Sequence, residues 1–95
     1  MAELILSPQA NEDLDDIWAY IAEDHLVNAD RFIDKLYDKS ILLAENPQIG
    51  VERPELIIGL RSFPVNHYVL FYQIRPNGIE MIRILRASRD LNQIF

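Results

Sequence analysis

The sequence predicts an α+β domain in which a helical hairpin packs on a small antiparallel sheet, in the element order β-α-α-β-β-β. Two observations support this prediction. Apolar residues recur at helical spacing through residues 8–45. Two strand-like runs, Tyr68–Arg75 and Ile79–Ala87, are joined by Pro76-Asn77-Gly78. Asn-Gly between such runs favours a hairpin, because both residues tolerate the positive φ of a tight turn.

The N-terminal segment is expected to hold a short strand and the first helix. Glu3–Leu6 is the strand candidate. Ser7 and Pro8 mark the helix start, because serine can cap a free N–H and proline at the first helical position loses no hydrogen bond. An apolar stripe then predicts a helix over residues 8–23; its members are Ala10, Leu14, Ile17, Trp18 and Ile21.

A second amphipathic helix is predicted over residues 29–45. Asn28 is its expected N-cap, and Asn46-Pro47 stops it, because proline disfavours helical geometry in the residue before it. Only about four residues separate the two helices, so they are expected to lie side by side as an antiparallel hairpin.

Three strands are expected after a loop over residues 48–59. Leu60–Phe63 is a short strand that Pro64 ends, which favours an edge position. Residues 68–75 carry large side chains on both faces, so this strand is expected to be central and buried on both sides. On the last strand, Ile82 and Ile84 are expected on one face, and Met81, Arg83 and Leu85 on the other.

Composition and charge restrict the classes of function that this protein can have. The 95 residues are expected to form one domain, residues 1–95, and the chain has no cysteine, no membrane-spanning apolar run and no basic leader, which is typical of a cytoplasmic protein. The net charge of −6 hides an asymmetry: residues 60–95 carry five arginines and two acidic residues (+3), whereas residues 1–59 carry four basic and thirteen acidic residues (−9). The net positive charge of residues 60–95 predicts that this segment forms a surface for binding a partner. The overall acidity argues against direct nucleic-acid binding by the chain alone.

Six sequence pieces, in this order and spacing, resemble the ParE/RelE superfamily of bacterial toxins from type II toxin–antitoxin pairs. They are residues 10–22 with Ala29, Asn46-Pro47-Gln48-Ile49-Gly50, Arg53-Pro54-Glu55-Leu56, Leu60-Arg61-Ser62, Tyr68-Val69-Leu70-Phe71-Tyr72, and residues 82–90. The Trp18-x-Tyr20-Ile21 pattern and the Arg89-Asp90 ending are more similar to the ParE branch than to the RelE branch.

This resemblance implies a toxin that binds a dedicated antitoxin through the antitoxin's C-terminal segment. ParE members poison DNA gyrase, whereas RelE members cut mRNA in the ribosome, so inhibition of gyrase by binding is the expected function. Three alternatives stay open: a RelE-type ribosome-dependent mRNA endonuclease, a relic that only binds antitoxin, and an unrelated α+β binding module. Many relatives carry a histidine where this chain has Arg86, so a function that depends on that imidazole cannot be expected of this protein.

The basic residues of the C-terminal part are the candidates for binding gyrase or another partner: Arg61, Arg83, Arg86 and Arg89. For Arg61 and Arg83, pairing with acidic residues of a packed helix is an equally weighted alternative. Asp90 is expected to pair with a nearby arginine. The antitoxin-groove candidates lie on the two helices and are Trp18, Phe32, Leu36 and Tyr37.

No catalytic residue, cofactor or metal site is expected. RNA cleavage needs an acid and a base close to an arginine. No lysine follows Lys39 and no His or Tyr follows Ala87, while His25 and His67 read as turn residues. The carboxylates of the first helix, Glu12, Asp13, Asp15 and Asp16, scatter around its axis, which indicates solubility and a favourable interaction with the helix dipole.

Overall fold

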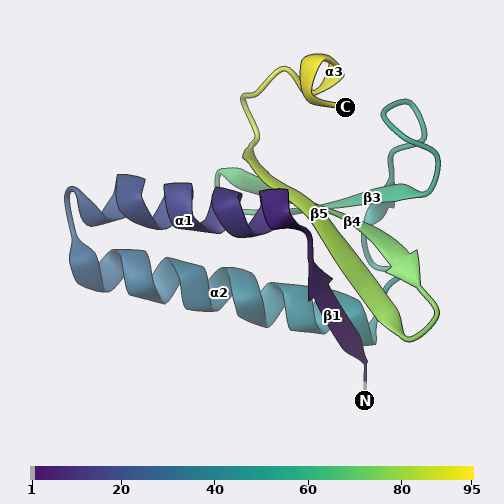
Figure 1. Cartoon of the computed structure of the whole chain (residues 1–95), viewed down its shortest axis with the longest axis horizontal. Coiled ribbons are helices and arrows are strands. Elements are labelled where there is room, and N and C mark those ends of the chain that lie inside the picture. Colours follow the sequence, from purple (N-terminus) through teal and green to yellow (C-terminus); the bar gives the residue numbers. More distant parts are fainter. Residues whose placement is uncertain (1) are drawn as a thin grey trace.

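The computed structural model describes residues 2–95 and confirms the predicted helical hairpin on a sheet (Figure 1). The elements are β1 (Glu3–Leu6), α1 (Pro8–Ala22), α2 (Leu26–Glu45), β2 (Val51–Glu52), β3 (Leu60–Val65), β4 (Tyr68–Arg75), β5 (Gly78–Arg86) and α3 (Leu91–Ile94). They form a five-stranded sheet in the order β1-β5-β4-β3-β2. The predicted antiparallel strands β3, β4 and β5 form its centre, and β1 adds to β5 in parallel. None of the described helices is long and apolar enough to cross a membrane.

Ser7 fixes the start of α1 against the sheet. Its hydroxyl accepts a hydrogen bond from the Ala10 N–H at 2.9 Å, which caps the helix as predicted. The same hydroxyl donates to the Ile82 carbonyl at 2.7 Å. One side chain therefore caps α1 and ties its first turn to β5.

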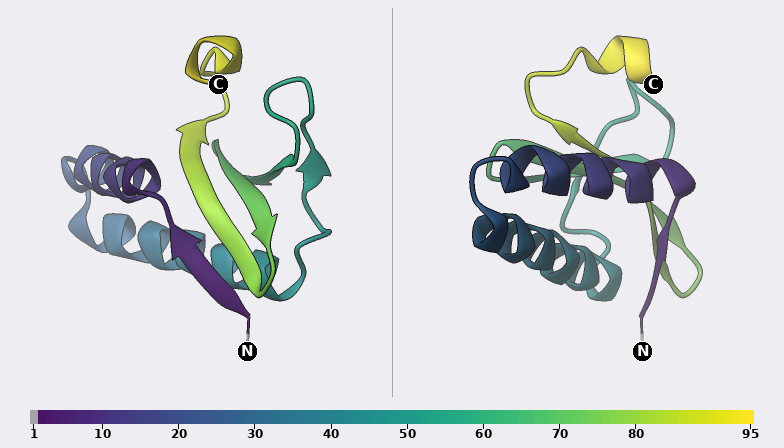
Figure 2. Two further views of the ribbon diagram at one scale, coloured as in Figure 1. Left: turned by 45° about the vertical axis from the view of Figure 1, so that its right-hand side comes forward. Right: turned by 60° about the vertical axis from the view of Figure 1, so that its left-hand side comes forward.

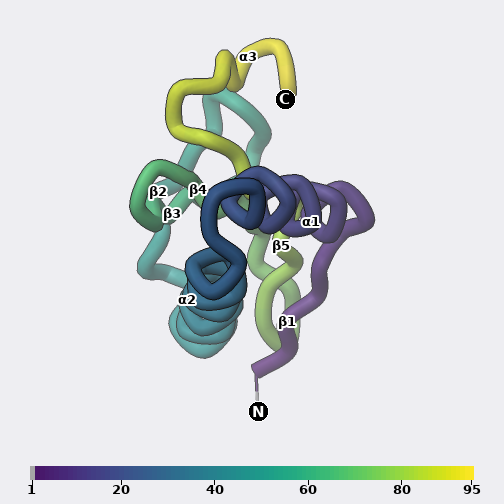
Figure 3. Tube along the Cα trace, turned by 90° about the vertical axis from the view of Figure 1, so that its left-hand side faces the viewer, coloured from purple at the N-terminus to yellow at the C-terminus, as the bar shows by residue number. Residues whose placement is uncertain are grey.

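The helix α2 begins three residues earlier than predicted, and the predicted Asn28 cap is wrong. His25 is the N-cap, and its Nδ1 accepts a hydrogen bond from the Asn28 N–H at 3.2 Å. An imidazole nitrogen supplies the acceptor that serine or asparagine usually provides. Viewed from the α1–α2 connection, the two helices lie side by side (Figure 3), and the Trp18 Nε1–H donates to Asp30 Oδ1 across them at 2.8 Å.

The two faces of the sheet carry separate apolar clusters. The larger cluster lies under α1 and α2 and includes fully buried Leu36 and Leu43. On the opposite face, Leu60, Phe71 and Leu85 form a smaller cluster that Leu91, Ile94 and Phe95 partly cover. Turned views separate the helical hairpin on one side from α3 near the far end of β5 (Figure 2). This arrangement confirms that β4 is central and buried on both sides.

A β-bulge makes the predicted face assignment of β5 wrong. Phe71 pairs with Arg83 and Tyr72 with Met81, so Ile82 is an extra residue opposite β4. One extra residue reverses the alternation of side chains beyond it. Met81 and Ile84 therefore both lie in the larger cluster, whereas Ile82 and Leu85 belong to the smaller one. The residues of each pair are three positions apart, although in a regular strand such residues would point to opposite faces of the sheet.

The β4–β5 hairpin is confirmed, but its turn differs from the prediction. Arg75 pairs with Gly78, so Pro76 and Asn77 occupy the central positions, and neither has a positive φ. Proline holds φ near −65°, which excludes the positive φ that type I′ and II′ turns need at their first central residue. Gly78 is instead required by β1, because a Cβ there would overlap the Glu3 backbone. Among the described residues other than glycine, a positive φ of 55° occurs at Asn66, in the β3–β4 turn.

The strand β3, which has only the two-residue strand β2 on its outer side, continues through Pro64, so its predicted end at that residue is wrong. Pro64 pairs with Val69 on the β4 side, while β2 covers only Arg61 and Ser62 on the other side. On the side of β3 that faces away from β4, no strand lies next to Pro64. The N–H that proline lacks would therefore have no acceptor in a neighbouring strand there.

Candidate partner-binding site

The end of β5 carries an arginine held between two aromatic rings. The guanidinium carbon of Arg86 lies 5.9 Å from the ring centroid of Tyr20 on α1 and 5.6 Å from that of Tyr68 on β4. Tyr68 is buried, and Phe32 of α2 packs against it with 5.5 Å between the ring centroids. Cation–π attraction to two rings limits the positions that this side chain adopts. Arg86 is therefore an exposed charge with a defined orientation.

Three residues earlier on the same strand, Arg83 is joined to the buried carboxylate of Asp13. Arg83 Nε and Nη2 donate to Asp13 Oδ2 and Oδ1 at 2.8 and 2.9 Å, and the Ile84 N–H donates to Oδ2 at 2.9 Å. The hydrogen bond to Asp13 raises the pKa of Arg83 further, so the guanidinium stays charged. Asp13 thus has a structural contact that its neighbours Asp15 and Asp16 lack, and it anchors α1 to β5 beside the bulge.

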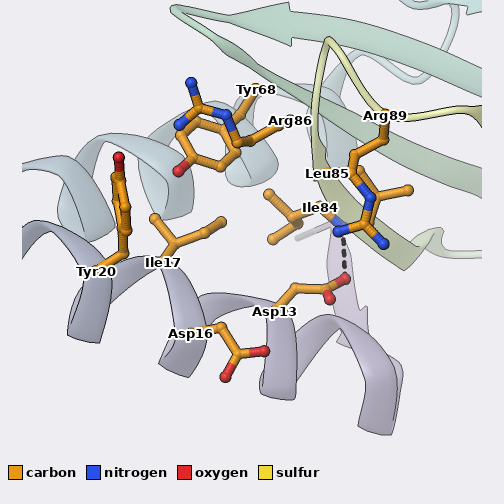
Figure 4. Close-up of a pocket in the computed structure, with 9 residues that line it drawn as sticks. All are labelled: Asp13, Asp16, Ile17, Tyr20, Tyr68, Ile84, Leu85, Arg86 and Arg89. Atoms are coloured by element: carbon orange, nitrogen blue, oxygen red, sulfur yellow. Dashed lines mark hydrogen bonds between the residues drawn. The ribbon is translucent and has the colours of Figure 1, made fainter.

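Between these two arginine environments lies an open hollow of about 270 Å³, here called the α1–β5 hollow (Figure 4). Asp13, Asp16, Ile17 and Tyr20 line it from α1. Tyr68, Ile84, Leu85, Arg86 and Arg89 line the opposite side. In Figure 4, Arg86 lies against the Tyr68 ring, and Arg89 extends on the Asp13 side. Both C-terminal arginines of the predicted set therefore border one surface depression.

A second hollow, of about 430 Å³, lies on the other side of Arg86 and is here called the cationic hollow. Arg31, Phe32 and Lys35 line it from α2, and Asn66 and His67 from the β3–β4 turn. Tyr20, Tyr68 and Arg86 border both hollows. The basic residues of this hollow come from segments far apart in the sequence, which is why charge counting along the chain did not find it.

The other two predicted arginines are engaged inside the fold. Arg61 donates to the backbone carbonyls of Gly50 at 2.7 Å and Gln48 at 3.3 Å, and it lies 3.4 Å from Glu52. Arg83 is held by Asp13. The structure thus places these two in internal contacts and brings only Arg86 and Arg89 together at an open surface. The expected Asp90–arginine pair is wrong, because Asp90 caps α3 by accepting from the Asn92 N–H.

The four groove candidates do not form one surface. Leu36 is completely buried in the larger cluster and therefore presents no contact area to a partner. Trp18 and Tyr37 are each 38% exposed on the helices. Phe32 is half-buried and lines the cationic hollow. Only the last three side chains have surface that another protein can reach.

The fold places more possible proton donors and acceptors around Arg86 than the sequence analysis expected. The sequence-based argument against RNA cleavage rested on the lack of a base close to the C-terminal arginines. In the fold, Lys35, His67 and two tyrosines line the same hollow as Arg86. Within residues 2–95, no group of three His, Cys, Asp or Glu side chains is arranged to hold a metal ion.

The fold of this chain is a known small α+β fold. It is similar to a solved structure titled "Chromosomal ParDE TA system from P. aeruginosa", with a TM-score of 0.77 over 93% of this chain and 98% of that chain. The two sequences are 21% identical, so this likeness concerns the shared fold.

The sequence comparisons identify the family. Residues 4–91 match the family described as "ParE toxin of type II toxin-antitoxin system, parDE". The chain is also 33% identical over 86 residues to "Toxin ParE1" of Caulobacter vibrioides, covering 90% of this chain and 88% of the relative. The chain therefore belongs to the ParE toxin family of type II toxin–antitoxin systems. This result confirms the resemblance and excludes an unrelated α+β binding module.

Proposed function

We propose that this ParE-family toxin inhibits DNA gyrase by binding it through Arg86 and Arg89, without chemistry of its own. The main supporting observation is the arrangement of Arg86, an exposed guanidinium held by two tyrosine rings. Neither Arg86 nor Arg89 forms an ion pair with any carboxylate of residues 2–95. Their donors are therefore available to a partner.

The proposed contact is one of charge and shape. A guanidinium whose position is already restricted loses less conformational entropy when it binds a carboxylate or phosphate. Arg89 lies along the same hollow and adds a second positive charge. Exposed charges mainly raise the association rate and set specificity, so single removals have graded, salt-sensitive effects. The proposed target places the action of the toxin in the cytoplasm.

We further propose that a cognate antitoxin neutralises the toxin by docking on its helical hairpin. The P. aeruginosa structure carries the name of a toxin–antitoxin system, which supports such a partner. Trp18, Phe32 and Tyr37 supply partly exposed aromatic surface. Co-expression with the neighbouring short reading frame is expected to give a complex that buries well over about 1,000 Å². Independent migration of the two proteins on a sizing column would contradict this partnership.

A RelE-type mRNA endonuclease is the second candidate function. The observation that favours it is the presence of Lys35, His67 and Tyr20 around Arg86, since these groups can move protons and stabilise a phosphate. The net charge of −6 opposes binding to RNA by phosphate contacts. A third possibility, a relic without toxicity, predicts antitoxin binding but no arrest of growth.

Gyrase supercoiling and translation assays with purified protein separate these functions. Wild-type protein is expected to block supercoiling and to leave ribosome-bound mRNA intact. Arg86→Ala and Arg89→Ala are each expected to weaken inhibition by about three- to thirtyfold, as for a screened surface contact. Loss of a transition-state contact in an enzyme costs more, on the order of 100-fold.

Arg75→Ala is the matched control, because Arg75 lies at the opposite end of the β4–β5 hairpin and pairs with Glu80 there. It removes the same charge and is expected to keep full inhibition. Cleavage of ribosome-bound mRNA with unaffected supercoiling would establish the endonuclease instead. Equal weakening by all three variants would assign the effect to net charge rather than to this site.

A further inference from the structure

The turn between β4 and β5 contains the only Asn-Gly pair of the sequence, Asn77-Gly78. Asn77 is exposed, and its side-chain amide forms no hydrogen bond within residues 2–95, whereas Arg75 and Gln73 beside it are bonded to each other. The amide carbon of an asparagine side chain is an electrophile, and the backbone nitrogen of the next residue is a nucleophile close to it. Glycine leaves that nitrogen least hindered, because it has no Cβ. The pair therefore holds both reactants of a cyclisation.

This cyclisation needs only water as a further reactant. The Gly78 nitrogen loses its proton to hydroxide and attacks Cγ of Asn77, which forms a C–N bond and a cyclic imide. The bond from Cγ to the side-chain nitrogen breaks, and that nitrogen leaves as ammonia after taking up a proton from water. Water then opens the imide. Attack at Cγ gives aspartate, whereas attack at the main-chain carbonyl carbon gives isoaspartate, whose main chain runs through Cβ and Cγ.

In the folded protein, β1 holds the peptide unit that must take part. The Glu3 N–H donates to the Asn77 carbonyl at 2.7 Å, and Glu3 pairs with Gly78 in the parallel β1–β5 ladder. A Cβ at position 78 would overlap the Glu3 backbone, so the two segments touch directly. The Asn77 oxygen and the Gly78 nitrogen belong to one planar unit and rotate together. The hydrogen bond from Glu3 therefore restricts the approach of the nitrogen to Cγ.

The strand β1 is held more weakly than the central strands. It has four residues, pairs with β5 alone and contains no fully buried residue. Segments with few buried apolar contacts open at a lower free energy than the rest of a fold. Leu4 and Leu6 are half-buried and pack against the larger cluster. These two side chains therefore control how often β1 leaves the sheet.

We propose that Asn77 is a modification site, where the chain deamidates through the Gly78 nitrogen when β1 is released, and that the isoaspartate formed there keeps β1 from returning. Isoaspartate inserts a carbon into the main chain and turns the carbonyl that accepted from Glu3 into a free carboxylate. The register of Glu3 with Gly78 is thereby lost. The reaction removes an edge strand of the toxin irreversibly, at a rate set by the opening of β1.

Asn66 provides an internal control within the same protein. It also lies in an exposed turn, but its Oδ1 accepts from Lys35 Nζ at 2.8 Å. His67 follows it, and the Cβ of that histidine hinders the backbone nitrogen. Trypsin does not cut between arginine and proline, so Asn66 and Asn77 lie in one tryptic peptide, residues 62–83. One measurement therefore compares both sites.

The test incubates the full chain in mildly alkaline buffer and follows this peptide by mass spectrometry. Exchange of an amide NH2 for OH marks deamidation, and fragment ions give its position and distinguish isoaspartate from aspartate. We expect both products at position 77 and none at position 66. Asn77→Gln is expected to abolish the reaction, because its longer side chain disfavours ring closure.

Leu4→Ala tests the control by β1. It is expected to raise the rate at position 77 about five- to tenfold, because the rate follows the population of the open state. Ile5→Ala is the matched control, since Ile5 lies on the same strand and is 43% exposed. It is expected to change the rate by less than about twofold. The melting temperature of each variant confirms folding at the temperature of incubation.

The modified wild-type protein is collected by ion exchange, since it carries an added negative charge. It is expected to melt about 4–8 °C below the unmodified protein, through loss of the β1 pairing. Asn77→Asp carries the same charge without the extra main-chain carbon and is expected to melt within about 2 °C of wild type.

Three results would overturn the inference. The first is an unmodified position 77 in the folded protein under conditions where the urea-unfolded chain reacts. The second is an equal rate for wild type and Leu4→Ala, because β1 would then not control the reaction. The third is an equal melting temperature for the modified protein and Asn77→Asp, because isoaspartate would then leave β1 in place.

Discussion

Arg83 and Arg86 lie three residues apart on β5, yet their surroundings differ in kind. Arg83 is bound at two nitrogens by the buried carboxylate of Asp13, which also accepts from the Ile84 N–H. Arg86 has two tyrosine rings beside it and no carboxylate. The first arginine completes the junction between α1 and the sheet, and the second offers its donors to the surface.

The difference shows that a positive residue marks a binding surface only when the fold leaves its charge uncompensated. Arg61 and Arg75 belong with Arg83, because each meets a carboxylate of the same protein. Arg89 belongs with Arg86. Substitutions at groups bonded inside the fold should therefore lower stability, whereas substitutions at the exposed arginines should weaken partner binding.

The largest effect is expected from Asp13→Ala. The change leaves the half-buried Arg83 without its partner and the Ile84 N–H without an acceptor. Loss of one member of a buried pair costs about 3–5 kcal/mol, and the partial exposure of Arg83 places the expected loss in unfolding free energy near 3 kcal/mol. Urea denaturation measures it.

Asp16→Ala is the control for this change, since Asp16 is an exposed carboxylate on the same helix. It is expected to alter stability by less than about 0.5 kcal/mol. Similar losses for both variants would mean that helix charge, rather than the Asp13–Arg83 junction, holds α1 in place.

An intermediate effect is expected from Tyr72→Phe. The buried Tyr72 hydroxyl accepts from the Gly50 N–H at 2.9 Å and donates to the Pro47 carbonyl at 2.7 Å. Its removal leaves both backbone groups without this partner, for a loss of about 1–2 kcal/mol in unfolding free energy. Tyr20→Phe, at the exposed tyrosine beside Arg86, is expected to change stability by less than about 0.5 kcal/mol.

Tyr72 also predicts a pH dependence. Burial raises the pKa of Tyr72 above its usual value of 10.0, so the folded protein keeps the phenol proton where the unfolded chain has lost it. The stabilisation by Tyr72 is therefore complete below about pH 10 and declines as the pH rises through the folded-state pKa. The stability difference between wild type and Tyr72→Phe should shrink in that range. A difference that grows would contradict this assignment.

The smallest effect is expected from Arg86→Lys. The ammonium keeps the charge but lacks the planar fork that stacks between Tyr20 and Tyr68. The proposed inhibition of gyrase should weaken by about two- to fivefold, less than for Arg86→Ala, with unfolding free energy unchanged within about 0.5 kcal/mol. Arg89→Lys, where no aromatic ring contact occurs within residues 2–95, should leave inhibition unchanged. Equal effects at both positions would show that the stacking does not matter.

Local patterns predicted most of the fold. Ser7 and Pro8 gave the start of α1, and the apolar stripes gave both helices, because these signals depend on neighbours within a few residues. The bulge at Ile82 and the close approach of Glu3 to Gly78 involve strand partners far away in the chain. Helix α3 was not predicted, since its four residues are ordered by packing on the smaller cluster.

For the candidate site, the sequence alone determined the chemical groups and the family resemblance: five arginines near the C-terminus, a basic end on an acidic chain, and the ParE-like motifs. The tertiary structure decided which arginines are free. Asp13 precedes Arg83 by 70 positions, and Lys35 precedes Asn66 by 31. Periodicity and charge counts describe neighbours along the chain, whereas compensation of a charge depends on neighbours in space, and only the packing of α1 and α2 on the sheet brings those together.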